Sequence, residues 1–307
     1  MDRYPPYRIL LTLLILIALI SIFKHFAPAP ERITGKEAHD SSIRFSAGRM
    51  RSPGVLPGRK VPARPIDQNN RGPEYPSGDS LALNGFLTRL LHSGDTVTIF
   101  HFGDSQLEGD RITRHLRQCF VNEGLTRVKV YNFSKRGAQS PQFEDSDTVL
   151  KWAGRNGIHP DLAILQYGLN LVRSGTNDFK FYQRRLANQV KILRKTYPGL
   201  SVLIIGVSDM SLRMADEVVP YATVPHIRDA QRRAAADTGS AFWDLLVFMG
   251  GPGSGKVWFS QDEPLIRPDL CHFSEAGGRK VGEGIYQVIK SEMIRYGQSR
   301  AVVQSNR

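Results

Sequence analysis

The chain of 307 residues has only two cysteines, and it contains neither a Cys-x-x-Cys nor a His-Glu-x-x-His motif. We therefore expect no metal site and no cofactor. Cys119 lies fourteen residues beyond Ser105 on an expected helix, which is roughly 20 Å along the axis. Cys271 adjoins His272, which we expect beside Ser105. A disulfide needs Cα atoms within about 7 Å, so both thiols are expected to be free and buried.

The sequence also lacks a run of basic residues interleaved with aromatic residues, the usual mark of a nucleic-acid-binding surface. Nucleic acid is therefore not an expected partner. The 41 lysine and arginine residues outnumber the 29 aspartate and glutamate residues, which gives a formal net charge of +12. Such an excess favours anionic partners such as acidic polysaccharide or membrane headgroups. A positive charge that serves only to keep the protein soluble would explain the excess equally well.

One long uncharged run stands near the N-terminus, where Ile9–Phe23 reads ILLTLLILIALISIF. Tyr7 and Phe26 extend it toward the roughly 20 residues that a bilayer requires. Arg3 and Arg8 precede the run, as on the cytoplasmic side of a membrane helix. Residues 1–26 are therefore expected to be a cytoplasmic stub and a transmembrane anchor, with the folded domain in the periplasm or at the cell surface.

A cleaved signal peptide is the alternative, and it would make the protein secreted. The best cleavage site follows Ala27-Pro28-Ala29, but Pro30 directly after the cut disfavours cleavage. Residues 27–78 are rich in proline, glycine, serine and arginine and show no apolar periodicity, so they are expected to be a flexible linker. The folded domain is expected over residues 79–297, with a flexible tail at 298–307.

From Asp79 onward, apolar segments with strand character alternate with amphipathic helices. The expected strands are Val97–Phe102, Val128–Phe133, Leu162–Tyr167, Val202–Val207 and Ala241–Leu246. The expected helices are Leu81–His92, one that carries Ile112 and Phe120, Thr148–Ala153, Phe179–Tyr197, Ile227–Asp237 and Glu275–Tyr296. This alternation predicts an α/β fold: a three-layer sandwich whose central, mostly parallel sheet is covered by helices on both faces.

The first of these strands ends in a Gly-Asp-Ser sequence at Ser105, and a helix is expected to open directly after it. Ser105 would then lie in a first helical turn, where backbone N–H groups and the helix dipole favour negative charge on a nucleophile. Taken alone, such a turn is more often an ordinary helix cap.

Three further signals follow in chain order. Gly137 comes after the second strand, where its N–H can approach a bound carbonyl closely. Asn170 comes after the third strand and offers a side-chain amide to an oxyanion. Asp269 stands three residues before His272, a spacing at which a carboxylate can orient an imidazole that takes the serine proton. Each signal is weak alone, but together they supply every part of an acyl-transfer site.

In these blocks the chain resembles the SGNH hydrolase superfamily, also called GDSL lipases and esterases. The family pattern of a Gly-Asp-Ser serine, a glycine, a Gly-x-Asn and a C-terminal Asp-x-x-His matches Ser105, Gly137, Gly168-x-Asn170 and Asp269-x-x-His272. The resemblance covers about residues 95–296. The order serine, aspartate, histidine also suits an α/β-hydrolase, but no G-x-S-x-G elbow is present.

The resemblance implies an SGNH fold, similar to flavodoxin, and a role for each matching residue. Ser105 would attack an ester, His272 would carry its proton, and Asp269 would hold His272. The backbone N–H groups of Ser105 and Gly137 and the amide of Asn170 would form the oxyanion hole. Gln106 stands where the family name has leucine, which we expect to affect substrate preference rather than chemistry.

Three functions fit these residues. The first is a serine esterase that forms an acyl-enzyme and removes O-acetyl groups from cell-envelope glycan. The second is an O-acyltransferase that adds acyl groups to an extracytoplasmic polysaccharide. The third is an inactive glycan-binding scaffold, which the complete residue set disfavours. The expected partner is an acylated carbohydrate or another ester, together with the membrane through the N-terminal helix.

Two other features, a glycine-rich segment and a histidine, are not expected to take part in catalysis. Gly250–Lys256 fits the phosphate-loop pattern G-x-x-x-x-G-K, but Val257 replaces the serine or threonine that binds Mg²⁺, and no helix start is visible before Pro264. We therefore expect a flexible loop there and no nucleotide. His101 falls within the first strand and is expected to be a core or edge residue.

Overall fold

The computed structural model describes residues 72–142, 148–214 and 217–305. The proposed anchor at Ile9–Phe23 and most of the linker lie outside these residues. Within the described part of the chain, no helix combines the length and the apolar character that crossing a bilayer requires.

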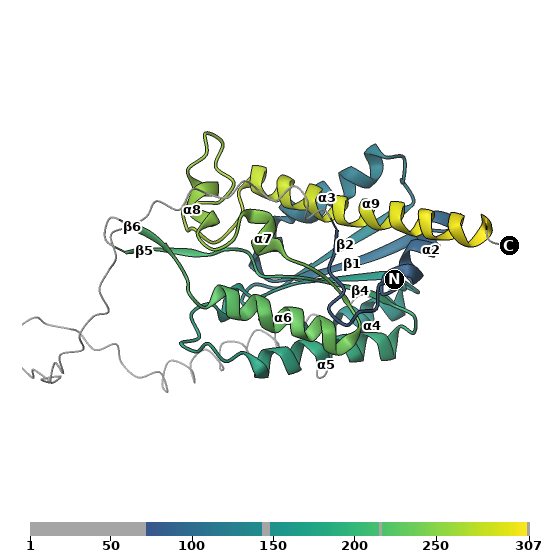
Figure 1. Ribbon diagram of the computed structural model, residues 1–307, viewed down its shortest axis with the longest axis horizontal. Helices are drawn as coiled ribbons and strands as arrows, with labels where there is room; N and C mark the ends of the chain where they lie inside the picture. Colours follow the sequence, from purple (N-terminus) through teal and green to yellow (C-terminus); the bar gives the residue numbers. More distant parts are fainter. Residues whose placement is uncertain (1–71, 143–147, 215–216, 306–307) are drawn as a thin grey trace, which may run out of the picture. The chain divides into compact units, whose positions relative to one another are not determined.

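Five parallel strands form the central sheet, in the order β2-β1-β3-β4-β7 (Figure 1). They are β1 (Val97–Gly103), β2 (Val128–Ser134), β3 (Leu162–Gln166), β4 (Ser201–Ile205) and β7 (Ala241–Trp243). Gly103 at the end of β1 is in register with Ser134 of β2 and with Gln166 of β3. The predicted parallel sheet is confirmed, and the segments that follow β1, β2 and β3 leave it at one common edge, where ligands bind in folds of this kind.

Helices cover both faces of this sheet (Figure 1). One layer contains α2 (Asn84–His92), α3 (Arg111–Asn122), α7 (Leu245–Met249), α8 (Ser254–Phe259) and α9 (Glu275–Ser305), and the other contains α4 (Thr148–Arg155), α5 (Lys180–Thr196) and α6 (Val224–Thr238). Alternate strand residues supply the two cores: Val97 and Ile99 of β1 face the first layer, whereas Phe100 and Phe102 face the second. The expected three-layer α/β arrangement is therefore present.

α3 packs closely against α9, and this packing fixes the relative position of the segments that lead into the two helices. A Cβ at Gly282 of α9 would lie 2.6 Å from the backbone oxygen of Ile112 in α3, so a side chain there would force the helices apart. Tyr286 of α9 packs edge-on against Phe120 of α3, with ring centroids 5.2 Å apart. Because α9 begins at Glu275, this contact holds the chain just after His272 close to the helix that follows Ser105.

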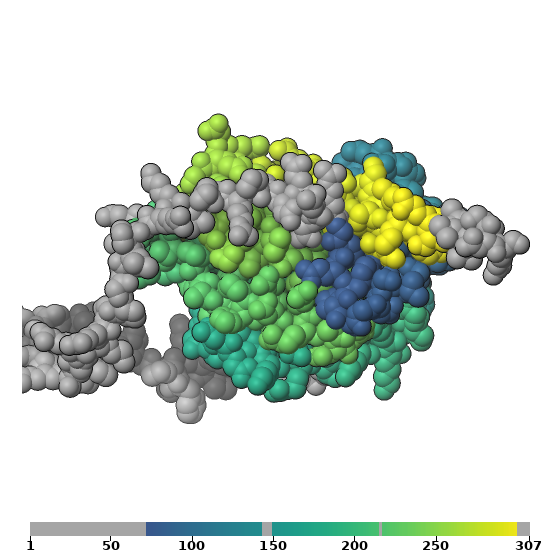
Figure 2. Space-filling model, in the orientation of Figure 1, coloured from purple at the N-terminus to yellow at the C-terminus, as the bar shows by residue number. Residues whose placement is uncertain are grey.

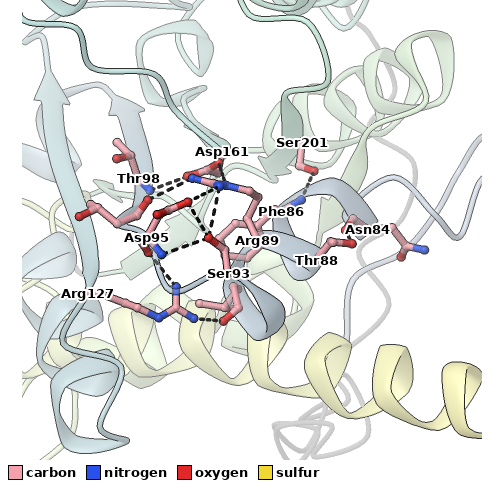
Figure 3. A network of polar contacts seen from close by, with 12 residues as sticks. Asn84, Phe86, Thr88, Arg89, Ser93, Asp95, Thr98, Arg127, Asp161 and Ser201 are labelled. Carbon is pink, nitrogen blue, oxygen red and sulfur yellow. Dashed lines mark hydrogen bonds and ion pairs between the residues drawn. The ribbon is translucent and has the colours of Figure 1, made fainter.

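A polar network lies at the opposite edge, around the amino ends of the strands (Figure 3). Asp161, just before β3, accepts hydrogen bonds from the backbone N–H of Thr98 at 2.8 Å and from Arg89 Nε at 3.2 Å. Arg89 also pairs with Asp95 at 3.0 Å. These contacts tie α2 to β1 and β3, and their place at the amino edge indicates a structural role.

Several short elements differ from the sequence prediction. β5 (Ser211–Met214) and β6 (Glu217–Pro220) form an antiparallel hairpin that extends beyond the end of the sheet (Figure 1). The strand predicted over Ala241–Leu246 ends at Trp243, because the Asp244 carboxylate accepts the Val247 N–H at 3.0 Å and starts α7. The prediction of a strand as far as Leu246 was wrong.

The described domain also extends past both expected boundaries. Glu74 forms an antiparallel bridge with Phe242, which satisfies backbone groups on the edge strand β7. The Arg295 guanidinium lies 5.4 Å from the centre of the Tyr75 ring, and this start of the described chain lies beside α9 (Figure 2). α9 itself continues to Ser305, beyond Tyr296 where the sequence places its end. Residues 72–78 therefore contact the domain and residues 298–305 are helical, whereas the sequence predicts a flexible linker and a flexible tail there.

Both cysteine thiols are free in the structure, as predicted. Cys271 is buried, and Cys119 is half-buried against the core between α3 and α9. Burial, together with the negative charge of Asp269, raises the pKa of Cys271 to about 12. The thiol next to His272 is therefore uncharged at neutral pH.

Candidate active site

Ser105 begins a short 3₁₀ turn, η1 (Ser105–Asp110), directly after β1. The Asp104 carboxylate caps this turn by accepting the Gln106 N–H at 3.0 Å. Gly109 and Asp110 have left-handed backbone conformations, with φ of 73° and 61°, so α3 starts anew at Arg111. Ser105 therefore lies in a first helical turn, as expected, but this turn is a separate 3₁₀ segment and not the start of the long helix α3.

Asp104 is almost completely buried beneath the turn, with 1% of its surface exposed. Burial raises the pKa of its carboxyl to about 6, and the backbone N–H groups of Gln106, Leu169 and Gly168 act in the opposite direction. The carboxylate thus joins the turn after β1 to the turn after β3.

Ser105, His272 and Asp269 form a continuous line of hydrogen bonds. Ser105 Oγ lies 2.8 Å from His272 Nε2, and His272 Nδ1 lies 2.9 Å from Asp269 Oδ2. Because a carboxylate can only accept, Nδ1 carries the proton in this arrangement and Nε2 is left to accept the serine hydroxyl. The geometry is that of a nucleophile, a base and a group that orients the base.

Asp269 is held by its own turn. Its Oδ1 atom accepts the backbone N–H groups of Cys271 at 3.0 Å and of His272 at 2.9 Å, while Oδ2 faces the imidazole. Leu270 adopts a left-handed conformation, with φ of 56°, to close this turn. Partial burial acts to raise the pKa of Asp269, but the hydrogen bonds from His272 and Cys271 outweigh it and lower the pKa below its usual value. The carboxylate is therefore ionised at neutral pH.

The structure also brings Gly137 and Asn170 to the same edge of the sheet. The chain after β2 turns back toward β1, since Lys135 N–H donates to the Gly103 carbonyl at 2.9 Å. Gly137 has φ of 76°, a left-handed conformation that residues with a side chain rarely adopt. Asn170 lies in η2 (Leu169–Leu171) and its Nδ2 donates to the Ala138 carbonyl at 2.8 Å. An amide nitrogen has two hydrogens, so the second remains for a ligand.

Gln106 faces the interior, with 6% of its surface exposed. Its Nε2 donates to Ser208 Oγ at 2.7 Å and to the Cys271 carbonyl at 3.2 Å. It therefore connects the nucleophile turn to the segment that carries His272. The expectation that Gln106 affects substrate preference is not supported by this buried position.

His101 and Gln166 lie behind Gln106. His101 is fully buried on β1, as expected, and its ring nitrogens lie 3.1 Å from Gln166 Oε1 and from Thr113 Oγ1. Burial lowers the pKa of His101 to about 4, so the ring is neutral at physiological pH. Sequence reasoning missed Gln166 and Ser208. For Gln166 the available signal was a polar residue at the end of an otherwise apolar strand.

The glycine-rich segment after α7 binds a carboxylate of the same chain. The N–H groups of Gly253 and Gly255 donate to Asp209 Oδ2 at 3.1 and 2.7 Å. The expectation that no helix starts here was wrong, because the six-residue helix α8 begins at Ser254. The absence of nucleotide binding stays a prediction, and the engagement of these N–H groups by Asp209 supports it.

Asp209 should make the stability of the domain depend on pH. Burial raises the pKa of its carboxyl to about 6, against the opposing effect of the Gly255 and Gly253 N–H groups. The folded protein thus binds this proton more tightly than the unfolded chain, whose aspartate pKa is about 3.9. This contribution to stability is complete below about pH 4 and is lost as the pH rises through about 6.

Asp209→Asn keeps an oxygen for both glycine N–H groups but removes the charge. We expect the free energy of unfolding of the variant, relative to that of wild type, to rise by about 1–3 kcal/mol from pH 4 to pH 8. Urea unfolding at both pH values measures this gain, with the exposed Asp262→Asn as the control. A difference between Asp209→Asn and wild type that does not vary with pH would contradict the prediction.

In the described ranges, no group of three histidine, cysteine, aspartate or glutamate side chains could hold a metal ion. Glu108 of η1 forms an ion pair with Arg136 at 2.6 Å. Arg136 lowers the pKa of Glu108 through a hydrogen bond and through its charge. This exposed pair connects the segments that follow β1 and β2.

The chain is similar to known lipases and esterases. The model of the GDSL-like lipase/acylhydrolase family matches residues 94–280. A search of curated proteins gives no match. Among solved structures, a peptidoglycan O-acetylesterase has 16% sequence identity and a TM-score of 0.59, over 73% of this chain and 98% of that one.

Two other solved structures have lower TM-scores. An acetyl xylan esterase has 17% identity and a TM-score of 0.46, over 63% of this chain and all of its own. A lipase/acylhydrolase from Enterococcus faecalis has 18% identity and a TM-score of 0.46, over 64% of this chain and 96% of its own. At this level of identity, the likeness to the peptidoglycan O-acetylesterase shows a shared fold.

Proposed function

The chain belongs to the GDSL-like lipase/acylhydrolase family, and we propose that it is a serine esterase that removes O-acetyl groups from cell-envelope glycan. Family membership makes it an SGNH esterase or acylhydrolase. The observation that carries the proposed chemistry is the line of hydrogen bonds from Ser105 through His272 to Asp269. The fold shared with a peptidoglycan O-acetylesterase and the net charge of +12 support a glycan substrate.

In the first half of the proposed reaction, Ser105 Oγ attacks the acetyl carbonyl carbon while His272 Nε2 takes the hydroxyl proton. The N–H groups of Ser105 and Gly137 and the Asn170 amide stabilise the oxyanion that forms. The bond between the carbonyl carbon and the sugar oxygen then breaks, and His272 returns the proton to that oxygen. The acetyl group is left on Ser105 as an ester.

In the second half, water attacks the acetyl-enzyme and His272 takes its proton. Collapse of the second tetrahedral intermediate releases acetate and restores the Ser105 hydroxyl. Asp269 stays ionised throughout and stabilises the imidazolium of His272. If a sugar hydroxyl replaced water in this step, the same residues would perform acetyl transfer.

The test measures acetate release from O-acetylated peptidoglycan and from 4-nitrophenyl acetate by the full chain, with Ser105→Ala as the matched control. We expect release from both substrates by wild type and from neither by the variant. Addition of a de-O-acetylated glycan acceptor distinguishes hydrolysis of the acetyl-enzyme by water from transfer of its acetyl group to a sugar hydroxyl. Acetyl groups that appear on the acceptor in place of free acetate would favour a transferase, and no acetyl chemistry with folded protein would refute the proposal.

We further propose that the catalytic domain lies outside the cytoplasm and is held there by Ile9–Phe23. The uncharged run and the arginines that precede it support this placement. Protease added to spheroplasts should then degrade the domain. A domain that stays intact until the cells are lysed would refute this placement.

Gln106→Leu should weaken catalysis through the position of His272. The change removes the hydrogen bonds to Ser208 and to the Cys271 carbonyl. Since a small misplacement of a catalytic group can cost about 10²-fold in rate, we expect kcat to fall roughly 10–100-fold with little change in KM. Steady-state kinetics on 4-nitrophenyl acetate, at a temperature where circular dichroism shows both proteins folded, measures this. A large rise in KM with unchanged kcat would instead support the original interpretation of substrate preference.

A further inference from the structure

Arg173 is an exposed cation that the described structure leaves without an acidic partner. None of the ion pairs within residues 72–142, 148–214 and 217–305 includes it. By contrast, Arg136 pairs with Glu108 at 2.6 Å and Arg228 pairs with Asp244 at 2.8 Å. The charge of Arg173 is therefore available to a ligand.

The side chain of Arg173 is nevertheless held in one place by Tyr221. Its Nε donates to the Tyr221 hydroxyl at 2.9 Å, and the guanidinium carbon lies 5.8 Å from the centre of the ring. Such a contact directs a planar guanidinium and lowers the entropy that it loses on binding. Tyrosine occupies Nε, and no hydrogen bond among the described residues uses the two terminal nitrogens, so both remain as donors.

Contacts through the backbone place this pair beside the candidate active site. Arg173 lies three residues after Asn170, and the Thr223 hydroxyl donates to the intervening Val172 carbonyl at 2.6 Å. Tyr221 N–H donates to the Met210 carbonyl at 3.0 Å. Two residues before Met210, Ser208 contacts Gln106, the neighbour of Ser105.

The segment that carries His272 is also close to this pair. Ser211 N–H, one residue after Met210, donates to the Leu270 carbonyl at 3.2 Å. Burial and nearby carboxylates raise the pKa of the Cys271 thiol, and the charge of Arg173 acts to lower it. The guanidinium therefore lies within electrostatic range of the residue next to His272.

We infer that Arg173, oriented by Tyr221, is a subsite for a carboxylate of the substrate, so that the esterase acts on an acidic O-acetylated glycan in preference to a neutral one. The two terminal nitrogens of a guanidinium match the two oxygens of a carboxylate. A carboxylate on the sugar or on an adjacent unit can bind there while its acetyl group lies at Ser105. The inference rests on the proposed esterase function and names its substrate class.

The test uses one polymer in two forms: O-acetylated polygalacturonate and the same polymer with its carboxylates methyl-esterified. Acetate release by the full chain gives kcat/KM for each form. We expect wild type to prefer the acidic form by about tenfold or more, which corresponds to one charge-assisted contact of at least about 1.4 kcal/mol. The preference should fall as salt concentration rises.

Arg173→Met should remove this preference by raising KM for the acidic form, whereas Tyr221→Phe should reduce it in part. The matched control is Arg155→Met, which removes the same charge from an exposed position at the end of α4, ahead of the amino end of β3. Hydrolysis of 4-nitrophenyl acetate, which has no carboxylate, should be unchanged in all three variants and shows that each is folded and active.

The outcomes separate this inference from the proposed function. If wild type hydrolyses 4-nitrophenyl acetate but shows no preference for the acidic polymer, or releases acetate from neither form, the subsite is refuted and the esterase stands. Equal loss of the preference in Arg173→Met and Arg155→Met would also refute the subsite, because it would reflect only overall charge. If no ester is cleaved, the esterase proposal itself fails.

Discussion

Ser105→Ala should lower kcat for ester hydrolysis by roughly 10⁵–10⁶-fold, the scale seen when the nucleophile of a catalytic triad is removed. The variant keeps the fold, since alanine preserves the turn that Asp104 caps through Gln106 N–H. It loses the Oγ atom that lies 2.8 Å from His272 Nε2 and would form the acyl-enzyme. Steady-state kinetics on 4-nitrophenyl acetate measures the loss.

The double change of Ser105→Ala and His272→Ala should cost little more than either change alone. His272 acts by taking the proton of Ser105, so once the hydroxyl is absent the imidazole has no step left to assist. Activity that falls by the product of the two single effects would contradict the assignment of one catalytic unit. Retention of more than a tenth of wild-type kcat by a folded Ser105→Ala variant would contradict the assignment of the nucleophile.

Asp269→Asn should lower kcat by about 10⁴-fold, the scale known for a triad whose histidine is held in the wrong tautomer. In wild type, Oδ1 accepts two backbone N–H groups and Oδ2 faces His272 Nδ1. An asparagine must place its oxygen toward the two N–H groups, which leaves its NH₂ group facing Nδ1. The imidazole then carries its proton on Nε2 and cannot accept the Ser105 proton.

The measurement compares kcat of Asp269→Asn with that of Asp262→Asn, an exposed aspartate seven residues earlier. Only the first should lose activity, and both should unfold at urea concentrations close to wild type. Labelling of Ser105 by a serine-directed phosphonate should also slow in Asp269→Asn, since the hydroxyl is less readily deprotonated. A change in kcat of less than tenfold in folded Asp269→Asn would show that Asp269 does not control the tautomer.

The main elements of the fold are predictable because each strand of the sheet is a short apolar run and each long helix carries an apolar stripe. The short elements are not. α8 has six residues and β5 has four, which is too short for a periodic pattern to emerge. The break between Ser105 and α3 was also missed, although Gly109 followed by Asp110 is a sequence in which left-handed conformations are common.

The candidate site shows a similar division. Ser105, Asp269 and His272 were identified from their types and spacing, and the structure places them within hydrogen-bonding distance. The burial of Gln106 was not predictable, because a polar residue beside a nucleophile gives no sign of whether it faces solvent or core. The contact between Arg173 and Tyr221 joins residues 48 positions apart and has no local signature.

The central claim is that Ser105 is the nucleophile of an esterase, and covalent labelling tests it most directly. The full chain is treated with a serine-directed fluorophosphonate, its residual activity on 4-nitrophenyl acetate is followed, and the modified residue is located by peptide mass mapping. We predict that one label per chain appears at Ser105 and that activity falls in proportion to labelling, with neither reaction in Ser105→Ala. A label at another residue, together with full activity in Ser105→Ala, would contradict the account.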